Sequence, residues 1–364
     1  MSQEPTDIRI DSAGPADRAE QVALYAVCFD KADGARVLPW RYGASPHGPS
    51  ISFLARDAQD VTLSGYACSP RIVVPNGRED QAALVGETGD VMTHPDHRGR
   101  GVFSSLDRAA MEATREAGWA CVFGLPNRQS AGIFTGKLGW SEVGQIRPFT
   151  FVLRADRVGR AERFRAGRVA SWLTPLAVRR GRAVRRNLSA QADRRRVEPL
   201  ERFGIDVTNL WKRVAPRWPW MVRRDADWLN WRFLDAPSGR FRALGIHQGG
   251  TLTAYAVVQV PEAGSGVGCL VDVLALEDAD LAAAVEAALG YLEAQGASVV
   301  KSHAIVGSWW ESRLLAFAFQ PPKAEDQKIV IAFVHDADHP LGKAVLEPHT
   351  WYFTDGDRDD ELVG

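Results

Sequence analysis

Hydrophobic and polar residues alternate along the chain with two different periods, which predict strands interleaved with helices. Apolar positions at every second residue, or in short runs that end in turn residues, predict strands at residues 8–10, 53–55, 63–67, 84–93 and 121–125. Apolar positions at a spacing of three or four predict helices at 22–29, 106–117 and 130–138. This order of strands and helices predicts an α/β fold.

Residues 91–106 contain the most distinctive of these transitions. A short apolar run ends in a His-Pro turn, a Gly-Arg-Gly turn follows at 99–101, and an amphipathic helix then begins. The first turn of a helix carries N–H groups without an intrahelical acceptor, and glycines let a ligand approach such groups closely. Arg98 and Arg100 add positive charge. The stretch therefore predicts a site for an anion, most often a phosphate.

The chain also contains an internal repeat. Residues 38–48 and 229–239 share leucine, tryptophan, arginine, an aromatic residue, proline and glycine at the same offsets. A predicted helix precedes both copies, at 22–29 and at 207–214. We interpret the match as a duplication. The predicted parts are a first domain at 1–153, a connector at 154–198 and a second domain at 199–364.

The second copy lacks the anion site of the first. Its strand at 270–276 continues into the helix at 281–293 through residues 277–280, which contain three acids and no glycine or arginine. Three carboxylates would repel a phosphate. We therefore expect one anion site per chain, in the first domain.

The predicted connector, residues 154–198, is dense in arginine. Three interpretations are open: a solvated helical connector, a basic patch that steers an anionic substrate, or a helix that lies on a membrane surface. A role in nucleic-acid binding is not expected, because the charge is confined to this segment.

Composition narrows the class of protein. The net charge is −1 and 45% of the residues are hydrophobic, which suits folded domains and gives no general attraction to nucleic acid. The four cysteines are scattered without metal-ligand spacing, so no metal is expected. Their scattered placement also predicts a reducing, cytoplasmic location. The first residues do not resemble a signal peptide, and no apolar run is long enough to span a bilayer.

The motif His-Pro-Asp-His-Arg-Gly-Arg-Gly-Val at 94–102, followed by Pro126-Asn127 and by Lys-Leu-Gly-Trp at 137–140, resembles the GNAT superfamily of acyl-CoA-dependent N-acyltransferases. The resemblance implies two tandem GNAT-type domains, each with a mixed central sheet flanked by helices, and acyl-CoA as co-substrate of the first. The family's turn usually ends in a small residue, where this chain has Phe103. In the family the turn amides hold the pyrophosphate of coenzyme A, and the preceding strand pairs with its pantetheine arm. Carried over, the expected coenzyme contacts are Val91, Met92, Thr93, Arg98, Gly99, Arg100, Gly101, Val102, Phe103, Ser104 and Asn127.

The resemblance also suggests the catalytic residues. Family members carry a glutamate or histidine base on the strand before the turn, a position that corresponds to Glu87; His94 and Asp90 are further candidates. Period-two alternation predicts that Glu87 and Val91 share a face and that Asp90 points the other way. The family's usual acid, a tyrosine, is absent, since the matching positions are Phe134 and Thr135.

The acceptor is the least defined part of the prediction. Trp40, Arg41 and Tyr42 fall in the segment that walls the acceptor site in GNAT folds, where they could stack on a base or sugar and hold a phosphate; their recurrence in the repeat equally favours a packing role. The tandem layout resembles bacterial enzymes that N-acylate nucleotide-linked amino sugars for cell-surface polysaccharides. The alternatives are another amine, such as an aminoglycoside, a polyamine or a protein amine, and a CoA-binding module without catalysis.

Overall fold

The computed structural model describes residues 8–154, 179–181, 183–185, 195–321 and 328–358. They form two compact units, each made from two stretches of chain. The first unit comprises residues 1–144 and 328–347, and the second comprises 145–327 and 348–364. Most of the predicted connector, 154–198, lies outside the described residues.

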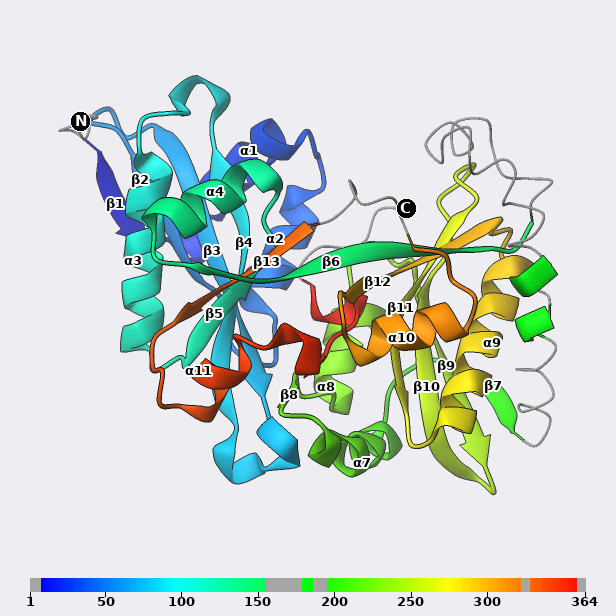
Figure 1. The fold of residues 1–364 in the computed structure, drawn as a ribbon. Coiled ribbons are helices and arrows are strands. Elements are labelled where there is room, and N and C mark those ends of the chain that lie inside the picture. Colours follow the sequence, from blue (N-terminus) through cyan, green and yellow to red (C-terminus); the bar gives the residue numbers. More distant parts are fainter. Residues whose placement is uncertain (1–7, 155–178, 182, 186–194, 322–327, 359–364) are drawn as a thin grey trace. The chain divides into compact units, whose positions relative to one another are not determined.

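The first unit is built on a mixed sheet (Figure 1). Its strands lie in the order β1 (Arg9–Ser12), β2 (Ile51–Arg56), β3 (Thr62–Val73), β4 (Ala83–Thr93), β5 (Cys121–Gly124) and β13 (Lys328–Val334). β4 and β5 run parallel, and the other neighbours are antiparallel. The helices of this unit are α1 (Arg18–Phe29), α2 (Gly34–Gly43), α3 (Val102–Glu116), α4 (Arg128–Lys137) and α11 (Pro340–Ala344). The strands and helices predicted within residues 8–138 are all present in that order, and the structure adds α2, which the pattern did not predict.

Helices cover both faces of this sheet, because neighbouring residues of its strands belong to different cores. Leu54 and Ala67 pack with α1 and α2, whereas Ala55 and Tyr66 pack with α3 and α4. A strand points successive side chains to opposite faces, so the α1–α2 layer and the α3–α4 layer lie on opposite sides.

The second unit repeats this sheet. Its strands lie in the order β7 (Arg196–Leu200), β9 (Phe241–Gln248), β10 (Thr251–Gln259), β11 (Val267–Ala275), β12 (Val299–Ile305) and β6 (Ser141–Val152). The β11–β12 pair is parallel, as β4–β5 is. The helices are α7 (Ile205–Val214), α8 (Ala226–Leu229) with a π-helical turn at Asn230–Leu234, α9 (Asp278–Ala294) and α10 (Trp309–Ala316). A separate two-stranded ladder joins β8 (Trp220–Met221) to β14 (Trp351–Tyr352).

The two halves of the chain exchange their last strands. β6 follows the first half in sequence and pairs with β12 in the second unit, while β13 comes from the second half and pairs with β5 in the first. The predicted contiguous domains, 1–153 and 199–364, place β6 with the first half and β13 with the second, whereas β6 belongs to the second unit and β13 to the first. Among the described helices, none has the length and apolar character needed to cross a membrane.

Candidate functional site

A glycine-rich turn connects β4 to α3 in the first unit. Gly99 and Gly101 have φ angles of 78° and 79°, in the left-handed region that glycine adopts without steric cost. A Cβ at either position would meet no atom within 4 Å, so the space beside the turn is open. Gly101 is the N-cap of α3 and supplies no capping side chain to the first-turn N–H groups. The turn can therefore hold an anion.

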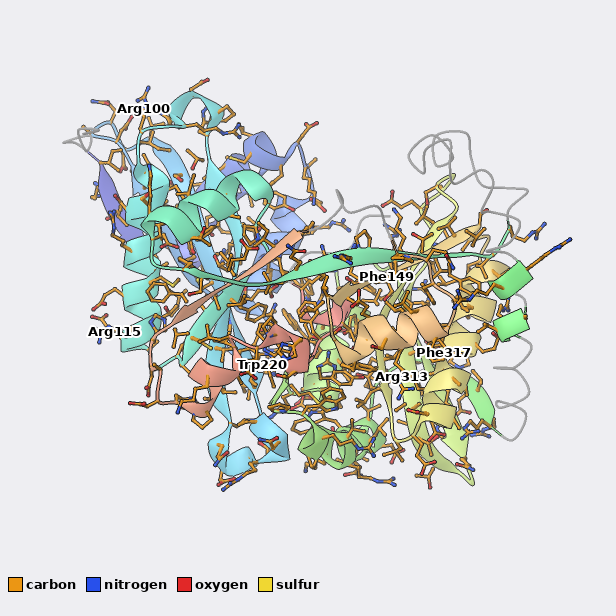
Figure 2. The ribbon with its side chains drawn as sticks, viewed as in Figure 1. Arg100, Arg115, Phe149, Trp220, Arg313 and Phe317 are labelled. Atoms are coloured by element: carbon orange, nitrogen blue, oxygen red, sulfur yellow. The ribbon has the colours of Figure 1, made fainter. Side chains whose placement is uncertain are left out.

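Two arginines border this turn. Arg98 Nε donates to the carbonyl oxygen of Thr93 at 3.3 Å, and Arg100 Nη2 donates to that of Asp96 at 3.4 Å. Both arginines are exposed, and Arg100 marks the N-terminal end of α3 in Figure 2, where Arg115 marks the other end. A guanidinium carries five N–H donors, so one bond to a carbonyl leaves donors for an anion.

Phe103 occupies the place where the family pattern has a small residue. Its ring stacks on Tyr66 with a centroid separation of 6.3 Å and meets Phe134 edge-on at 5.0 Å. The side chain thus packs into the core between the sheet and α3, and its backbone N–H belongs to the first turn of that helix. Phe134, at one of the positions of the missing tyrosine, is likewise a core residue.

β4 leaves its parallel neighbour shortly before the turn. β4 and β5 pair only at residues 86–88 of β4 and 122–124 of β5. On the other side, Gly65 pairs with Met92 and Ala67 with Gly89, so that Asp90 and Val91 together face a single residue of β3. This is a β-bulge, which bends a strand and increases its twist. Residues 91–93 consequently have no ladder partner on β5.

The bulge changes which face each side chain of β4 meets. Val91 packs in the core beneath α3 and α4, whereas Asp90 bonds to residues of α2. Glu87 is opposite Ser69, which shares a face with Ala67 in the core beneath α1 and α2. Glu87 and Asp90 therefore lie on the same side, and Val91 lies on the other. The predicted alternation was wrong here, because the extra residue shifts the period.

The Glu87 carboxylate lies in a buried ion pair. Its partner is the Arg71 guanidinium on β3, and the two side chains are 1% and 2% exposed. Arg71 also donates to the carbonyl oxygen of Pro70 at 3.0 Å. This carboxylate therefore has a buried cation as its partner and almost no contact with solvent.

Asp90 is joined to the predicted substrate-binding triplet. Arg41 Nη1 lies 2.5 Å from Asp90 Oδ2, and the Tyr42 hydroxyl donates to the same oxygen at 2.9 Å. Trp40, Arg41 and Tyr42 are all buried in α2. The structure thus brings Asp90 together with Arg41 and Tyr42, in an arrangement that ties α2 to the bulge.

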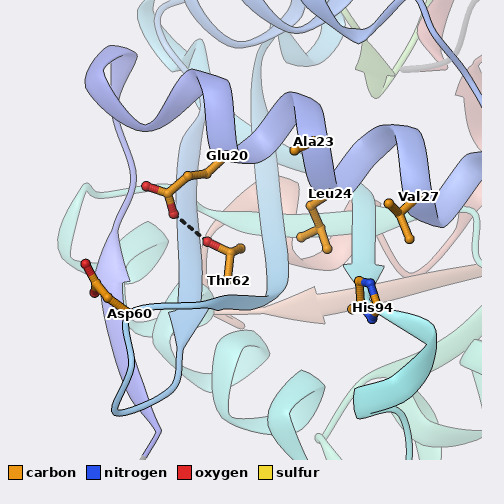
Figure 3. Close-up of a pocket in the computed structure, with 7 residues that line it drawn as sticks. All are labelled: Glu20, Ala23, Leu24, Val27, Asp60, Thr62 and His94. Carbon is orange, nitrogen blue, oxygen red and sulfur yellow. Dashed lines mark hydrogen bonds between the residues drawn. The ribbon is translucent and has the colours of Figure 1, made fainter.

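His94, a further candidate base, borders a pocket. The pocket has a volume of about 290 Å³ and lies between α1, the β2–β3 turn and the end of β4 (Figure 3). Its lining residues are Glu20, Ala23, Leu24, Val27, Asp60, Thr62 and His94. The His94 side chain is 33% exposed, and its Nδ1 accepts from the Asp96 N–H at 3.4 Å. Nε2 has no hydrogen-bond partner within the part of the chain that the structure describes.

Asn127 has a local structural role. It is the N-cap of α4, where its side-chain oxygen accepts from the Ser130 N–H at 2.9 Å. Capping of this kind satisfies one of the open N–H groups of a helix. The amide NH₂ of Asn127 and one lone pair of its side-chain oxygen remain for a ligand.

Asp107 is a buried carboxyl group that the sequence did not single out. It lies on α3 and accepts hydrogen bonds from the Tyr66 hydroxyl at 2.8 Å and from the indole N–H of Trp140 at 3.2 Å. Burial raises its pKa from 3.8 to about 6. An acidic residue directly after Leu106, on the apolar side of a helix, is the signal that could have identified it.

Comparisons with known proteins place this geometry in context. Residues 9–143, which lie within the first unit, match the family model described as acetyltransferase (GNAT) domain. No protein of curated function matches the sequence.

Solved structures of similar fold cover most of the chain. A probable N-acyltransferase from Enterococcus faecalis V583 aligns over 92% of this chain and 74% of its own, with a TM-score of 0.62 and 13% identity. A GCN5-related N-acetyltransferase from Anabaena variabilis ATCC 29413 aligns over 91% and 73%, with a TM-score of 0.62 and 12% identity. A tandem GNAT protein from the clavulanic acid biosynthesis pathway aligns over 91% and 99%, with a TM-score of 0.56 and 14% identity.

Proposed function

We propose that the first unit binds acyl-CoA and transfers its acyl group to an amine. The matched GNAT domain supports the class of acyl-CoA-dependent acyltransferase, and the neighbours confirm the predicted fold. The observation that carries the proposal is the combination of a strand that leaves its neighbour after Thr88 and an open, left-handed glycine turn before α3. The turn would receive the pyrophosphate, and residues 91–93 the pantetheine arm, by strand addition.

Transfer needs an uncharged amine nitrogen next to the thioester. The nitrogen attacks the carbonyl carbon, the carbon–sulfur bond breaks, and the sulfur leaves as a thiolate, while the amine loses one proton to a base. A backbone N–H near Met92, on the side that β5 has left, would stabilise the negative charge that develops on the carbonyl oxygen.

His94 is the proposed proton acceptor. Glu87 is held by Arg71, and Asp90 by Arg41 and Tyr42, whereas His94 borders a pocket. A neutral imidazole whose Nδ1 accepts a bond carries its proton on Nε2. Nε2 can therefore take up a substrate proton only after the ring proton moves to Nδ1, which must first give up its bond to the Asp96 N–H. Replacement of His94, the proposed proton acceptor, by glutamine should reduce kcat by about 10²- to 10⁴-fold. Glu87→Gln should instead lower the free energy of unfolding, because it breaks the buried pair with Arg71.

The acceptor remains a proposal with two versions. A nucleotide-linked amino sugar requires cationic groups for its phosphates, but Arg41 is buried and engaged with Asp90. The pocket beside His94 is lined by Glu20 and Asp60, which already pair with Arg56 and Arg9. No arginine or lysine is among its described lining residues, so it offers no cation to a phosphate and suits an acceptor without phosphate, such as a polyamine or an aminoglycoside. We therefore rank a cationic small-molecule amine above the nucleotide-linked sugar.

Binding of acyl-CoA can be tested by two matched glycine variants. Gly101→Val places a branched side chain at a φ of 79° on the proposed pyrophosphate turn, and Gly118→Val places it at a φ of 75° just beyond the other end of the same helix. Neither position has an atom within 4 Å, so both variants carry similar strain. Calorimetric titration with acetyl-CoA should show loss of binding only for Gly101→Val. Equal binding by both variants would contradict the proposed site.

The acceptor can be identified by mass spectrometry of reaction products. The purified chain would be incubated with acetyl-CoA and longer acyl-CoAs, together with polyamines, aminoglycosides, peptides and dTDP- or UDP-linked amino sugars. An acylated cationic amine would support the preferred version, and an acylated sugar would restore the other. Bound CoA without any acylated product would favour a CoA-binding module without catalysis.

A further inference from the structure

Asp90 has a backbone conformation that is unusual for a residue inside a strand. Its φ is 47°, whereas the other described non-glycine residues with positive φ, which are Asp30, Asp60, Asn76 and Ala318, lie in turns, in a 3₁₀ segment or at helix ends. The left-handed region suits the first residue of a β-bulge, where glycine is the usual choice. An aspartate at this position indicates that the carboxylate is needed for something that glycine cannot supply.

The carboxylate is held by two donors from one helix. Arg41 Nη1 and the Tyr42 hydroxyl, both in the last turn of α2, meet the same oxygen of Asp90 at 2.5 and 2.9 Å. The side chains of Asp90 and Arg41 are 7% and 8% exposed. A charged pair with so little solvent contact is a firm tether, because the loss of one member leaves the other buried and uncompensated.

The tether acts at the place where β4 changes direction. The last residue of β4 that pairs with β5 is Thr88, and Asp90 follows two positions later. The extra residue of the bulge turns Val91 toward the α3–α4 core and Met92 toward the α1–α2 core. If the bulge were lost, residues 91–93 would each turn to the opposite face.

We infer that Asp90 is a positioning residue, held by Arg41 and Tyr42, that sets the bulge and thereby aims the backbone of residues 91–93 at the acyl donor. The inference rests on the proposed function for what this backbone binds. It assigns neither the role of base to Asp90 nor that of phosphate ligand to Arg41. The other part of the inference, that the tether fixes β4, rests on the geometry alone.

A series of substitutions at Asp90 separates positioning from proton transfer. Asp90→Asn keeps an acceptor for Tyr42 and a residue type that tolerates positive φ, whereas Asp90→Ala loses the tether and strains the backbone. The asparagine variant lacks the charge that pairs with Arg41, so we expect its KM for acyl-CoA to rise less than that of the alanine variant, while its pH profile keeps the wild-type shape. For the alanine variant we expect KM for acyl-CoA to rise about tenfold or more. Equal loss of kcat in both variants, with the limb of the pH profile removed, would overturn the inference.

Asp30→Ala is the matched control. Asp30 has a φ of 54° at the C-terminal end of α1 and is exposed, so alanine there introduces similar strain away from β4. It should leave KM unchanged. A rise in KM that matches that of Asp90→Ala would show that general strain, and not the tether, is responsible.

Hydrogen exchange provides a readout that does not depend on activity. The His94 N–H donates to the carbonyl oxygen of Leu63 at 2.9 Å, just beyond the bulge. Exchange in residues 91–94 should accelerate in Asp90→Ala and, to a smaller degree, in Asp90→Asn and Tyr42→Phe. If the wild-type chain bound no acyl-CoA, the proposed function would fail, yet this exchange pattern would still support the tether. Unchanged exchange in Asp90→Ala would refute it, and Tyr42→Phe decides the matter if Asp90→Ala does not fold.

Discussion

The two units have the same strand order but differ where the fourth strand of each sheet leaves the fifth. In the first unit, β4 and β5 separate after Thr88, and the open glycine turn follows. In the second unit, β11 and β12 separate after Cys269, and the C-terminal segment 354–358 packs at this place. There the N–H of His303 on β12 donates to Asp355 at 2.8 Å, and Gly356 lies against Asp272 of β11.

The duplicated arginine has a different partner in each unit. Arg41 of the first copy pairs with the Asp90 carboxylate on the strand. Arg232 of the second copy donates to the carbonyl oxygens of Gly356 at 3.0 Å and Arg358 at 2.7 Å, both in the C-terminal segment. In each unit the arginine therefore joins its helical segment to a neighbouring stretch of the same unit.

This difference explains why one unit is a better candidate for acyl-CoA than the other. In the second unit, Asp355 accepts a hydrogen bond from β12 and Gly356 lies against β11, so the C-terminal segment occupies the place beside the separated strands. Residues 354–358 are all buried, and residues 277–280 add carboxylates where the first unit has its turn. A duplicated fold can thus keep its architecture and lose the site.

The largest effect is expected from breaking the charge cluster that holds the C-terminal segment. Arg224 is fully buried and contacts Asp357 Oδ2 at 2.6 Å and Asp272 Oδ1 at 3.3 Å. Arg224→Met leaves two carboxylates buried without their cation, which should lower the free energy of unfolding by about 3–5 kcal/mol. Urea titration, with hydrogen exchange to assign the loss to the second unit, measures this.

Arg202→Met is the control for this prediction. Arg202 pairs with Asp235 at 2.8 Å, but both side chains are about half exposed, and exposed pairs contribute about 1 kcal/mol or less. Similar small losses in the two variants would mean that the cluster does not hold the segment in place.

The next effect concerns a buried carboxyl group in each unit. Tyr255 donates to Asp272 in the second unit, where Arg224 supplies a cation, whereas Tyr66 donates to Asp107 in the first, where the other donor is the neutral indole of Trp140. Burial raises the pKa of Asp107 from 3.8 to about 6. The folded chain therefore keeps a proton between these pH values that the unfolded chain has released, so the free energy of unfolding falls as pH rises through this range.

Asp107→Asn removes this titration. The difference between 3.8 and about 6 corresponds to about 3 kcal/mol. The stability of the variant relative to the wild type should therefore increase by up to that amount between about pH 3.5 and about pH 7. Urea titrations across the range measure it. Asp107→Ala, although less stable throughout, should show the same pH dependence as Asp107→Asn; a wild-type curve parallel to both would contradict the prediction.

Local features of the chain were predictable because each depends on residues close in sequence. The glycine turn at 99–101, the strand before it and the repeated Trp-Arg-aromatic segments could all be recognised from short patterns. The α3 helix was predicted, but its buried face was only partly right. The helical spacing predicts one apolar face of Leu106, Ala109, Ala110, Ala113 and Ala117. The structure buries Leu106 and Ala110 together with Asp107, Met111 and Thr114, leaves Ala109 and Ala113 half-buried, and exposes Ala117.

Features that depend on distant pairing could not be predicted. Arg41 and Asp90 are 49 residues apart, and no periodicity links them. The left-handed position of the bulge is occupied by Asp90 and not by glycine, so the sequence pattern did not indicate a bulge. Simple alternation therefore placed this carboxylate on the wrong face. The exchange of β6 and β13 likewise has no local signal, because either strand could complete either sheet.

The smallest effect tests whether the C-terminal segment fits its place tightly. A Cβ on Gly356 would lie 2.9 Å from Phe233 Cζ and 3.2 Å from the Cβ of Asp272, so Gly356→Ala should cost about 1–3 kcal/mol by overpacking. Gly204→Ala, where a Cβ meets no atom within 4 Å, should change stability by about 0.5 kcal/mol or less. Equal effects in urea titration would show that the segment is loosely held.

Even when loosened, the C-terminal segment should not give the second unit a CoA site, because residues 277–280 remain acidic. Titration of Gly356→Ala should therefore still find one acetyl-CoA per chain, and a second molecule would break the comparison between the units.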